Sequence, residues 1–212
     1  MKSLNLRAEP IHFLEVLAFP FALLFFDPSK ESLMLGVGLS ILSLILKVWL
    51  FAYPKKKNKK FEVYGPYRFL RHPYFCSTLI LIIAASIAGR SMETLLVFMT
   101  LFAFLFSRDA KKIDEKRKVH FGSDYTYYRH CISSLVPGVV PYPAATQKEP
   151  SLKNIFDVRY KAEIDTFITV AVFFSYAFAY STLHDIRLYH LGIAACLWVL
   201  VLFRLGRLVK IR

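Results

Sequence analysis

Residues 62–75, with the sequence EVYGPYRFLRHPYF, hold a dense group of side chains that could do chemistry. Two arginines, a histidine and three tyrosines lie there with two prolines, directly before a long apolar segment. The imidazole of His72 titrates near neutral pH and can therefore accept or donate a proton. The aromatic faces of Tyr67 and Tyr74 attract cations. This segment therefore has the side chains to bind a charged ligand.

A second polar segment, SRDAKKIDEKRKVHFG at 107–122, combines acidic and basic residues with strong helix formers. It ends in a glycine suited to a helix C-cap, so the sequence predicts a helix that ends there. A short helix is expected to begin near Ser123 or Asp124. That helix would carry Tyr125 and Tyr128 on one side, because they are three residues apart.

The elements that must position these segments are apolar. The chain has 212 residues, of which 56% are hydrophobic, and these fall into blocks rather than amphipathic stripes. A membrane-spanning helix needs about 20 such residues. The sequence predicts an all-α, multi-pass helical membrane protein with about six transmembrane helices and a cytoplasmic amphipathic helical segment. The predicted spans are roughly 11–26, 33–53, 74–89, 92–107, 164–183 and 187–203.

The net charge of +13 is distributed unevenly along the chain. Only Lys30, Arg90 and Arg187 are basic in the three connections DPSKES, GRSM and TLHDIR, which would share one side of the membrane. The positive-inside rule then places both termini, the 54–73 connection and the 108–162 segment in the cytoplasm. Basic residues beside apolar spans indicate this topology and anionic headgroups rather than nucleic acid.

The sequence does not indicate a dinucleotide-binding site, a disulfide framework or a zinc site of the kinds found in soluble proteins. The GVGLSI sequence at 36–41 lacks the third glycine and the preceding strand of a dinucleotide-binding motif. Three well-separated cysteines give neither a disulfide framework nor a zinc site, and no metal site is expected. Glu15 and His12, near the cytoplasmic end of the first span, are expected to snorkel to the membrane surface.

Four units follow from this pattern. Residues 1–60 form an N-terminal transmembrane hairpin with the basic connector PKKKNKK, and residues 61–140 form a core that holds both polar segments. Residues 141–162 are a linker, and residues 163–212 form a C-terminal transmembrane hairpin. Since both polar segments of the core are predicted on the cytoplasmic side, they can converge there.

The sequence GPYRFLRHPY at 65–74 is followed by an apolar hairpin, a charged helix and FGSDYTYYRHCISSLVP at 121–137. This arrangement, covering residues 62–137, resembles the signature of the isoprenylcysteine carboxyl methyltransferases and related phospholipid methyltransferases. The resemblance implies an integral membrane enzyme that uses S-adenosylmethionine to methylate a lipid-anchored or lipidic acceptor. The acceptor group would be a prenylcysteine-like carboxylate or a phospholipid amine.

The resemblance also implies roles for particular residues. The substrate-facing arginine of the family has its nearest counterpart in Arg108. Apart from the resemblance, histidine titrates near neutral pH, so His72 or His120 could serve as the base if the acceptor is an amine. A sulfonium methyl group is already activated, so its transfer needs mainly alignment in a dry site. The cofactor contacts would fall on Tyr67, His72, Pro73, Tyr74 and Phe75, and on Asp114 or Glu115 of the later helix.

Two other classes stay open. The RHP triplet, GSDYTYYRHC and VPGVVPY also resemble the carboxyl-terminal part of the membrane sterol reductases, which would imply an NADPH-dependent reductase. A haem-binding membrane protein of the nitric-oxide-reductase-associated or carotene-isomerase type is the other alternative. Both have a distinct ligand, so binding of S-adenosylmethionine, NADPH or haem separates the three classes.

The predicted topology is testable with reporters fused to the full chain. A reporter at Ser32 is expected outside and one at Lys57 inside, because basic residues collect on the cytoplasmic side. Accessibility of each reporter to an impermeant reagent in intact cells gives the answer. The reverse pattern would place the two polar segments on the side away from a cytosolic cofactor.

Overall fold

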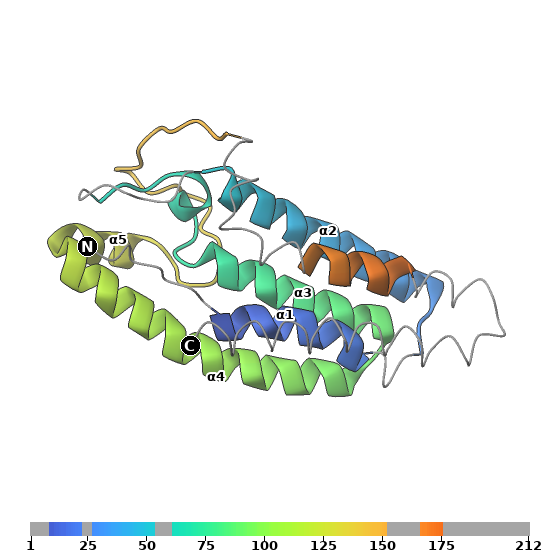
Figure 1. The fold of residues 1–212 in the computed structure, drawn as a ribbon. Helices are drawn as coiled ribbons and strands as arrows, with labels where there is room; N and C mark the ends of the chain where they lie inside the picture. The colour runs from blue at the N-terminus through green and yellow to red at the C-terminus, as the bar shows by residue number, and fades with distance from the viewer. Residues whose placement is uncertain (1–8, 23–26, 54–60, 152–165, 176–212) are drawn as a thin grey trace, which may run out of the picture.

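A computed structural model describes residues 9–22, 27–53, 61–151 and 166–175 of this chain. This part is helical, with no strand in it, as the sequence predicts. Four long helices lie roughly side by side in a bundle (Figure 1). They are α1 (Glu9–Ala22), α2 (Lys30–Phe51), α3 (Pro73–Gly89) and α4 (Met92–Phe121), accompanied by the shorter 3-10 helix η2 (Gly65–Arg68), α5 (Ser123–Cys131) and an apolar helix, Thr166–Ser175.

The second, third and fourth predicted spans fall on α2, α3 and α4 with shifted ends. The described parts of the first and fifth fall on α1 and Thr166–Ser175, and their remaining residues lie outside the described part of the chain. The α4 helix continues from the fourth predicted span through the charged segment and ends at Phe121, which confirms the helix end predicted at Gly122. A tight turn joins α3 to α4, with Arg90 in the left-handed conformation and the Ser91 hydroxyl accepting a hydrogen bond from Thr94 N. The predicted span at 187–203 lies outside the described residues.

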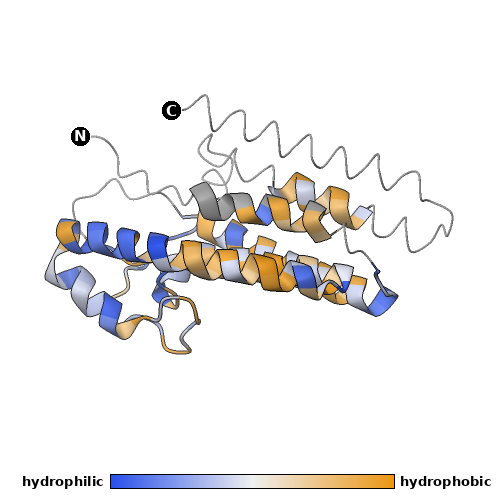
Figure 2. Ribbon diagram, turned by 90° about the horizontal axis from the view of Figure 1, so that it is seen from below, coloured by the Kyte–Doolittle hydropathy of each residue, from blue (hydrophilic) through white to orange (hydrophobic). Residues whose placement is uncertain are grey.

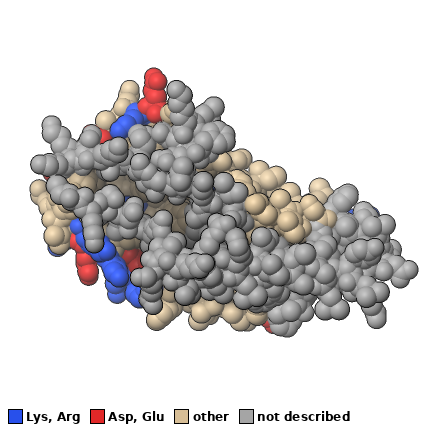
Figure 3. All heavy atoms as spheres, in the orientation of Figure 1, with Lys and Arg blue, Asp and Glu red and all other residues tan. Residues whose placement is uncertain are grey.

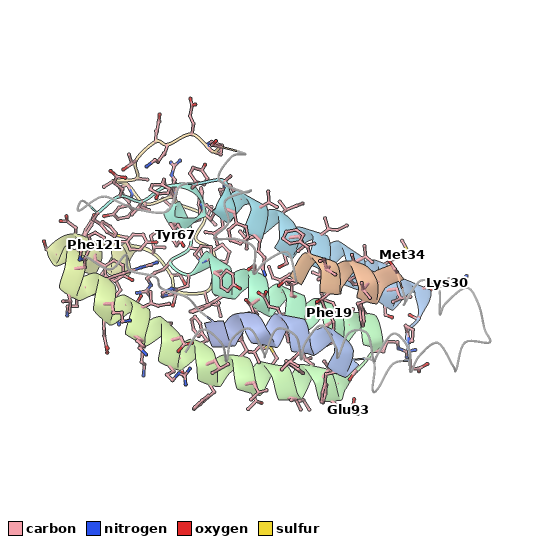
Figure 4. All side chains as sticks on the ribbon, viewed as in Figure 1. Phe19, Lys30, Met34, Tyr67, Glu93 and Phe121 are labelled. Carbon is pink, nitrogen blue, oxygen red and sulfur yellow. The ribbon has the colours of Figure 1, made fainter. Side chains whose placement is uncertain are left out.

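Apolar and polar residues separate along the bundle. Figure 2 shows hydrophobic residues along most of the helices and hydrophilic residues gathered at one end, where α4 ends and α5 begins. The same end holds Tyr67 and Phe121, whereas Lys30 and Glu93 lie at the opposite end (Figure 4). We call the first of these the polar end. Within the described residues, α2 is the one helix long and apolar enough to cross a membrane, and α3 and Thr166–Ser175 are shorter apolar helices.

The α3 helix is central to the bundle, since it packs most extensively against α2 and also contacts α1 and α4. Small residues bring α2 and α3 close together. The Ser43 hydroxyl donates to the Ser77 carbonyl at 2.7 Å, and the Ser32 hydroxyl donates to the Ala88 carbonyl at 3.3 Å. Such small-residue contacts with side-chain hydrogen bonds are typical of helix pairs in membranes.

A buried ion pair crosses the bundle core. The Lys47 ammonium of α2 pairs with the Glu15 carboxylate of α1, and both side chains are fully buried. The Thr78 hydroxyl also donates to Glu15, and Lys47 lies 5.2 Å from the centre of the Tyr74 ring. The prediction that Glu15 snorkels is wrong, because its charge is neutralised inside the bundle by a lysine from the next helix. The side chain of His12 lies outside the described part.

Gly36 provides a test of the α2–α3 contact. A Cβ atom built on Gly36 would lie 2.6 Å from Ala88 Cβ and 3.0 Å from the Ala84 carbonyl oxygen, so Gly36→Val must separate the helices. Overpacking of this kind costs about 1–3 kcal/mol. Gly38→Val is the matched control, because nothing lies within 4 Å of its Cβ position and it is in the same helix. The midpoint temperature of thermal unfolding in detergent should fall for Gly36→Val alone. An equal decrease of that temperature in both variants would contradict the close contact.

Candidate functional site

One wall of the candidate site is the segment between α2 and α3. Gly65 has a φ of +58°, and a Cβ there would lie 2.6 Å from the Tyr53 ring, so glycine is needed at this turn. The 3-10 turn η2 begins at Gly65 and has Pro66 as its second residue. His72 has the non-helical angles φ −127° and ψ 66° directly before Pro73, where α3 begins. The sequence predicts this start of α3 from the restriction that proline places on the preceding residue.

A returning segment fixes this wall from behind. The backbone N–H of Arg71 donates to the Ser133 carbonyl at 2.9 Å, and that of His72 donates to the Ser134 carbonyl at 3.2 Å. Further along, Tyr142 N donates to the Arg68 carbonyl at 2.8 Å. The backbone of residues 68–72 is therefore held in place by residues 133–142.

The opposite wall is made by α4 and α5. Gly122 has a φ of +60° and turns the chain, as its predicted capping role requires, so that α5 begins at Ser123. Tyr125 and Tyr128 then face inward and are buried, which confirms their predicted common side. The Tyr128 hydroxyl donates to the Tyr67 carbonyl at 2.8 Å and so joins the two walls.

The Asp114 carboxylate lies where the two walls meet. The Tyr125 hydroxyl donates to Oδ1 at 2.5 Å, and His72 Nε2 lies 3.0 Å from the same oxygen. Arg71 Nη1 lies 3.2 Å from Oδ2, and Arg129 Nε lies 3.9 Å from it. We call these five residues the Asp114 cluster. It places one acid among two arginines, a histidine and a tyrosine drawn from three separate segments.

Two donors in this cluster keep hydrogen-bonding capacity. Arg71 Nη1 and His72 Nε2 are within ion-pair distance of Asp114 but are not aligned for hydrogen bonds, and Arg71 Nε also has no hydrogen-bond partner among the described residues. Both side chains are largely buried, with 11% and 4% exposed respectively. Buried donors of this kind are costly unless they find a partner, so they favour a ligand at this place.

The surroundings of His72 and Asp114 lower the pKa of both groups, for different reasons. Burial lowers the pKa of His72 and outweighs the contact with Asp114 and its charge, which would raise it. Burial alone would raise the pKa of Asp114, but the contacts with His72 and Tyr125 and the charge of Arg71 outweigh it and hold that pKa below its usual value. At neutral pH the cluster therefore contains a neutral imidazole beside an ionised carboxylate.

Aromatic rings enclose the cluster. The His72 ring stacks on Phe75 with centroids 5.4 Å apart, and the Phe106 ring lies edge-on to both. The half-buried Arg117 lies over the Tyr67 ring at 5.7 Å. Burial raises the pKa of Tyr125 to about 12, with a contribution from its bond to Asp114, so this hydroxyl stays a donor.

A hollow of about 240 Å³ opens beside the Asp114 cluster at the surface. Its lining is mainly polar and basic and includes two members of the cluster, Tyr125 and Arg129. In Figure 3 most of the charged side chains visible on this face also lie toward the polar end. The lining residues are Lys118, Tyr125, Thr126, Arg129 and His130.

The structure brings some of the predicted site residues together. His72 and Asp114 are in contact, Phe75 stacks on His72, and Pro73 starts α3 beside them. Tyr67 supports the cluster from the side, through Tyr128 and Arg117.

Other predicted residues lie elsewhere. Tyr74 faces Lys47 in the bundle, and Glu115 is exposed on α4. Arg108 is 55% exposed and pairs with the adjacent Asp109, not with Asp114. The cationic partners of Asp114 are Arg71 and Arg129, neither of which the sequence assigns to the site. Both arginines lie in sequences that carry the resemblance, Arg71 in the RHP triplet and Arg129 in GSDYTYYRHC, but the sequence does not show which basic residues reach Asp114.

The described residues contain no group of three or more histidine, cysteine, aspartate or glutamate side chains placed to hold a metal ion. The chain matches no protein-family model, no curated protein and no solved structure. The chemistry of the Asp114 cluster is therefore the basis for any functional conclusion.

The lowered pKa of His72 predicts a pH dependence of stability. Because the folded protein binds this proton less readily than the unfolded chain, stability is lost as pH falls below the ordinary histidine pKa of about 6.5. The midpoint temperature of thermal unfolding in detergent should therefore decrease as the pH is lowered from about 7.5 to 5.5. The decrease should be smaller in His72→Gln. His120→Gln is the control, since His120 is exposed on α4. An unchanged pH profile in His72→Gln would show that the imidazole is not kept neutral.

Proposed function

We propose that this protein is a multi-pass integral membrane protein whose polar end faces the cytoplasm. The exposed faces of α2 and α4 support this, because large apolar side chains cover them. A bilayer would cover these faces, and the basic residues beside them follow the positive-inside distribution. The proposal includes six spans with both termini cytoplasmic. The apolar side chains concerned include Met34, Leu35, Ile41, Leu42, Ile45, Leu96, Leu101 and Phe104.

We further propose that it is an S-adenosylmethionine-dependent methyltransferase of the isoprenylcysteine carboxyl and phospholipid methyltransferase type. The single observation that carries this proposal is the contact of His72 with Asp114 at 3.0 Å. It joins GPYRFLRHPY to the charged helix of the family resemblance, through two residues that are 42 positions apart in the chain. The contact lies at the polar end of an apolar bundle, where a cytosolic cofactor and a lipidic acceptor would meet.

The residues of the cluster fit the charged groups of this cofactor. The unsatisfied Nε and Nη1 of Arg71 suit its carboxylate. Asp114 suits its amino group or ribose hydroxyls, and the rings of Phe75 and Phe106 suit a cationic sulfonium. When bound, the cofactor supplies an activated methyl group. The role of the protein's own residues is then to orient the cofactor, to exclude water and to align the acceptor.

The protonation states favour a carboxylate acceptor over an amine. An amine must lose a proton before it is methylated, but the Nε2 atom of His72 faces Asp114 and the ring is buried. A carboxylate needs no base, and the half-exposed Arg129 at the rim of the hollow can pair with it. We therefore propose Arg129, in place of Arg108, as the residue that binds the acceptor, and a lipid-anchored carboxylate as the acceptor group.

Equilibrium binding of S-adenosylmethionine to the full chain in detergent tests the proposal. Asp114→Asn and Arg71→Lys keep the side-chain size but alter the charge or the donor geometry, and each should weaken binding at least about tenfold, or about 1.4 kcal/mol. Glu115→Gln is the control, because Glu115 is adjacent but exposed. Transfer of a labelled methyl group to a prenylcysteine analogue completes the test. Failure of the folded wild-type chain to bind would overturn the proposal.

A further inference from the structure

The loop at 136–140 exposes an unusual amount of apolar surface. Val136, Val139 and Val140 are 69%, 96% and 74% exposed, although they belong to a segment whose backbone is tied to the rest of the molecule. We call residues 136–140 the valine loop. In Figure 2 the connection that follows α5 projects from the polar end, and part of it is coloured as hydrophobic. Clustered exposed apolar residues of this kind mark an interaction site.

The valine loop is held in a defined shape. Gly138 N donates to the Phe69 carbonyl at 2.8 Å, and Tyr142 N donates to the Arg68 carbonyl at the same distance. Pro137 and Pro141 restrict the backbone on either side of the tip. Because these bonds fix the middle of the loop at Gly138 and the chain just after it at Tyr142, the exposed valines are presented at little further cost in ordering.

The valine loop continues an apolar face of the bundle. Phe69, which accepts the bond from Gly138, has its ring 6.3 Å from that of Trp49. Trp49 is 40% exposed and lies near the end of α2, the helix with the longest exposed apolar face. Aromatic residues at such positions are typical of the membrane interface.

The Arg68 charge beside Phe69 suits anionic lipids. The basic run PKKKNKK follows directly after Tyr53, at the end of the α2 segment. The Arg68 guanidinium lies over the Phe69 ring at 6.0 Å. A basic residue near an anionic leaflet adds to binding, so an arginine packed on the ring of Phe69, which bonds the valine loop, suits the headgroup region of a bilayer.

We propose that the valine loop inserts into the headgroup region of an anionic cytoplasmic leaflet, next to the end of α2. The inference rests on the proposed membrane location of the bundle and deepens it. The segment that carries the loop also accepts the backbone hydrogen bonds of Arg71 and His72. Lipid insertion would thereby hold the candidate site at the depth where a lipid-anchored acceptor presents its polar group.

Depth-dependent fluorescence quenching tests the insertion without any need for cofactor or turnover. Trp49 and Trp198 are replaced by phenylalanine, and a single tryptophan is introduced as Val139→Trp or Val140→Trp. Val119→Trp is the matched control, since Val119 is 89% exposed on the charged part of α4. The full chain is reconstituted in phosphatidylcholine and phosphatidylglycerol vesicles with bromine near the headgroup end of the acyl chains.

Tryptophan at 139 or 140 should be quenched about twofold more than tryptophan at 119, with emission at shorter wavelength. Quenching at both loop positions no stronger than at 119 would overturn the inference. Two loop positions are used so that one poorly folding variant does not decide the outcome. Strong loop quenching in a protein that fails to bind S-adenosylmethionine would uphold the membrane contact and reject only the proposed enzyme activity.

Discussion

The Asp114 carboxylate is the point on which the polar end of this molecule depends. A buried carboxylate costs several kcal/mol of solvation unless cationic and hydrogen-bonding groups replace water around it. Here Asp114 is on α4, and those groups come from Arg71 and His72 of the 61–72 segment and from Tyr125 and Arg129 of α5. Because each of them is needed to offset the same charge, the three segments must be in place together.

This requirement explains the backbone arrangement around the cluster. Gly65 and Gly122 take positive φ values and turn the chain, the first before the His72 segment and the second between α4 and α5. Pro73 is the first residue of α3. The 133–142 segment then fixes Arg71 and His72 through main-chain bonds, which do not depend on side-chain identity. The walls of the site are thus set by turns and backbone contacts, and the ionic contacts add to a frame that is already constrained.

Local signals in the sequence predicted much of this frame. Proline restriction gave the start of α3, the glycine cap gave the end of α4, and helical spacing gave the common side of Tyr125 and Tyr128. The convergence of His72 with Asp114 followed from topology. The partners Arg71 and Arg129 did not, because choosing among 28 basic residues needs the rotation of each helix about its axis. The pairing of Glu15 with Lys47 was missed for the same reason.

That last pair has a consequence for how the protein would enter a bilayer if it lies in a membrane as proposed. The two charges lie 32 positions apart on consecutive helices, and each is fully buried against the other. In the proposed bilayer setting, a lone glutamate on α1 would meet hydrocarbon unpaired until α2 arrived with its lysine, at a cost of several kcal/mol. On the proposed membrane location, the Glu15–Lys47 pair favours entry of α1 and α2 into lipid together, because each helix would otherwise carry a buried charge without its ionic partner.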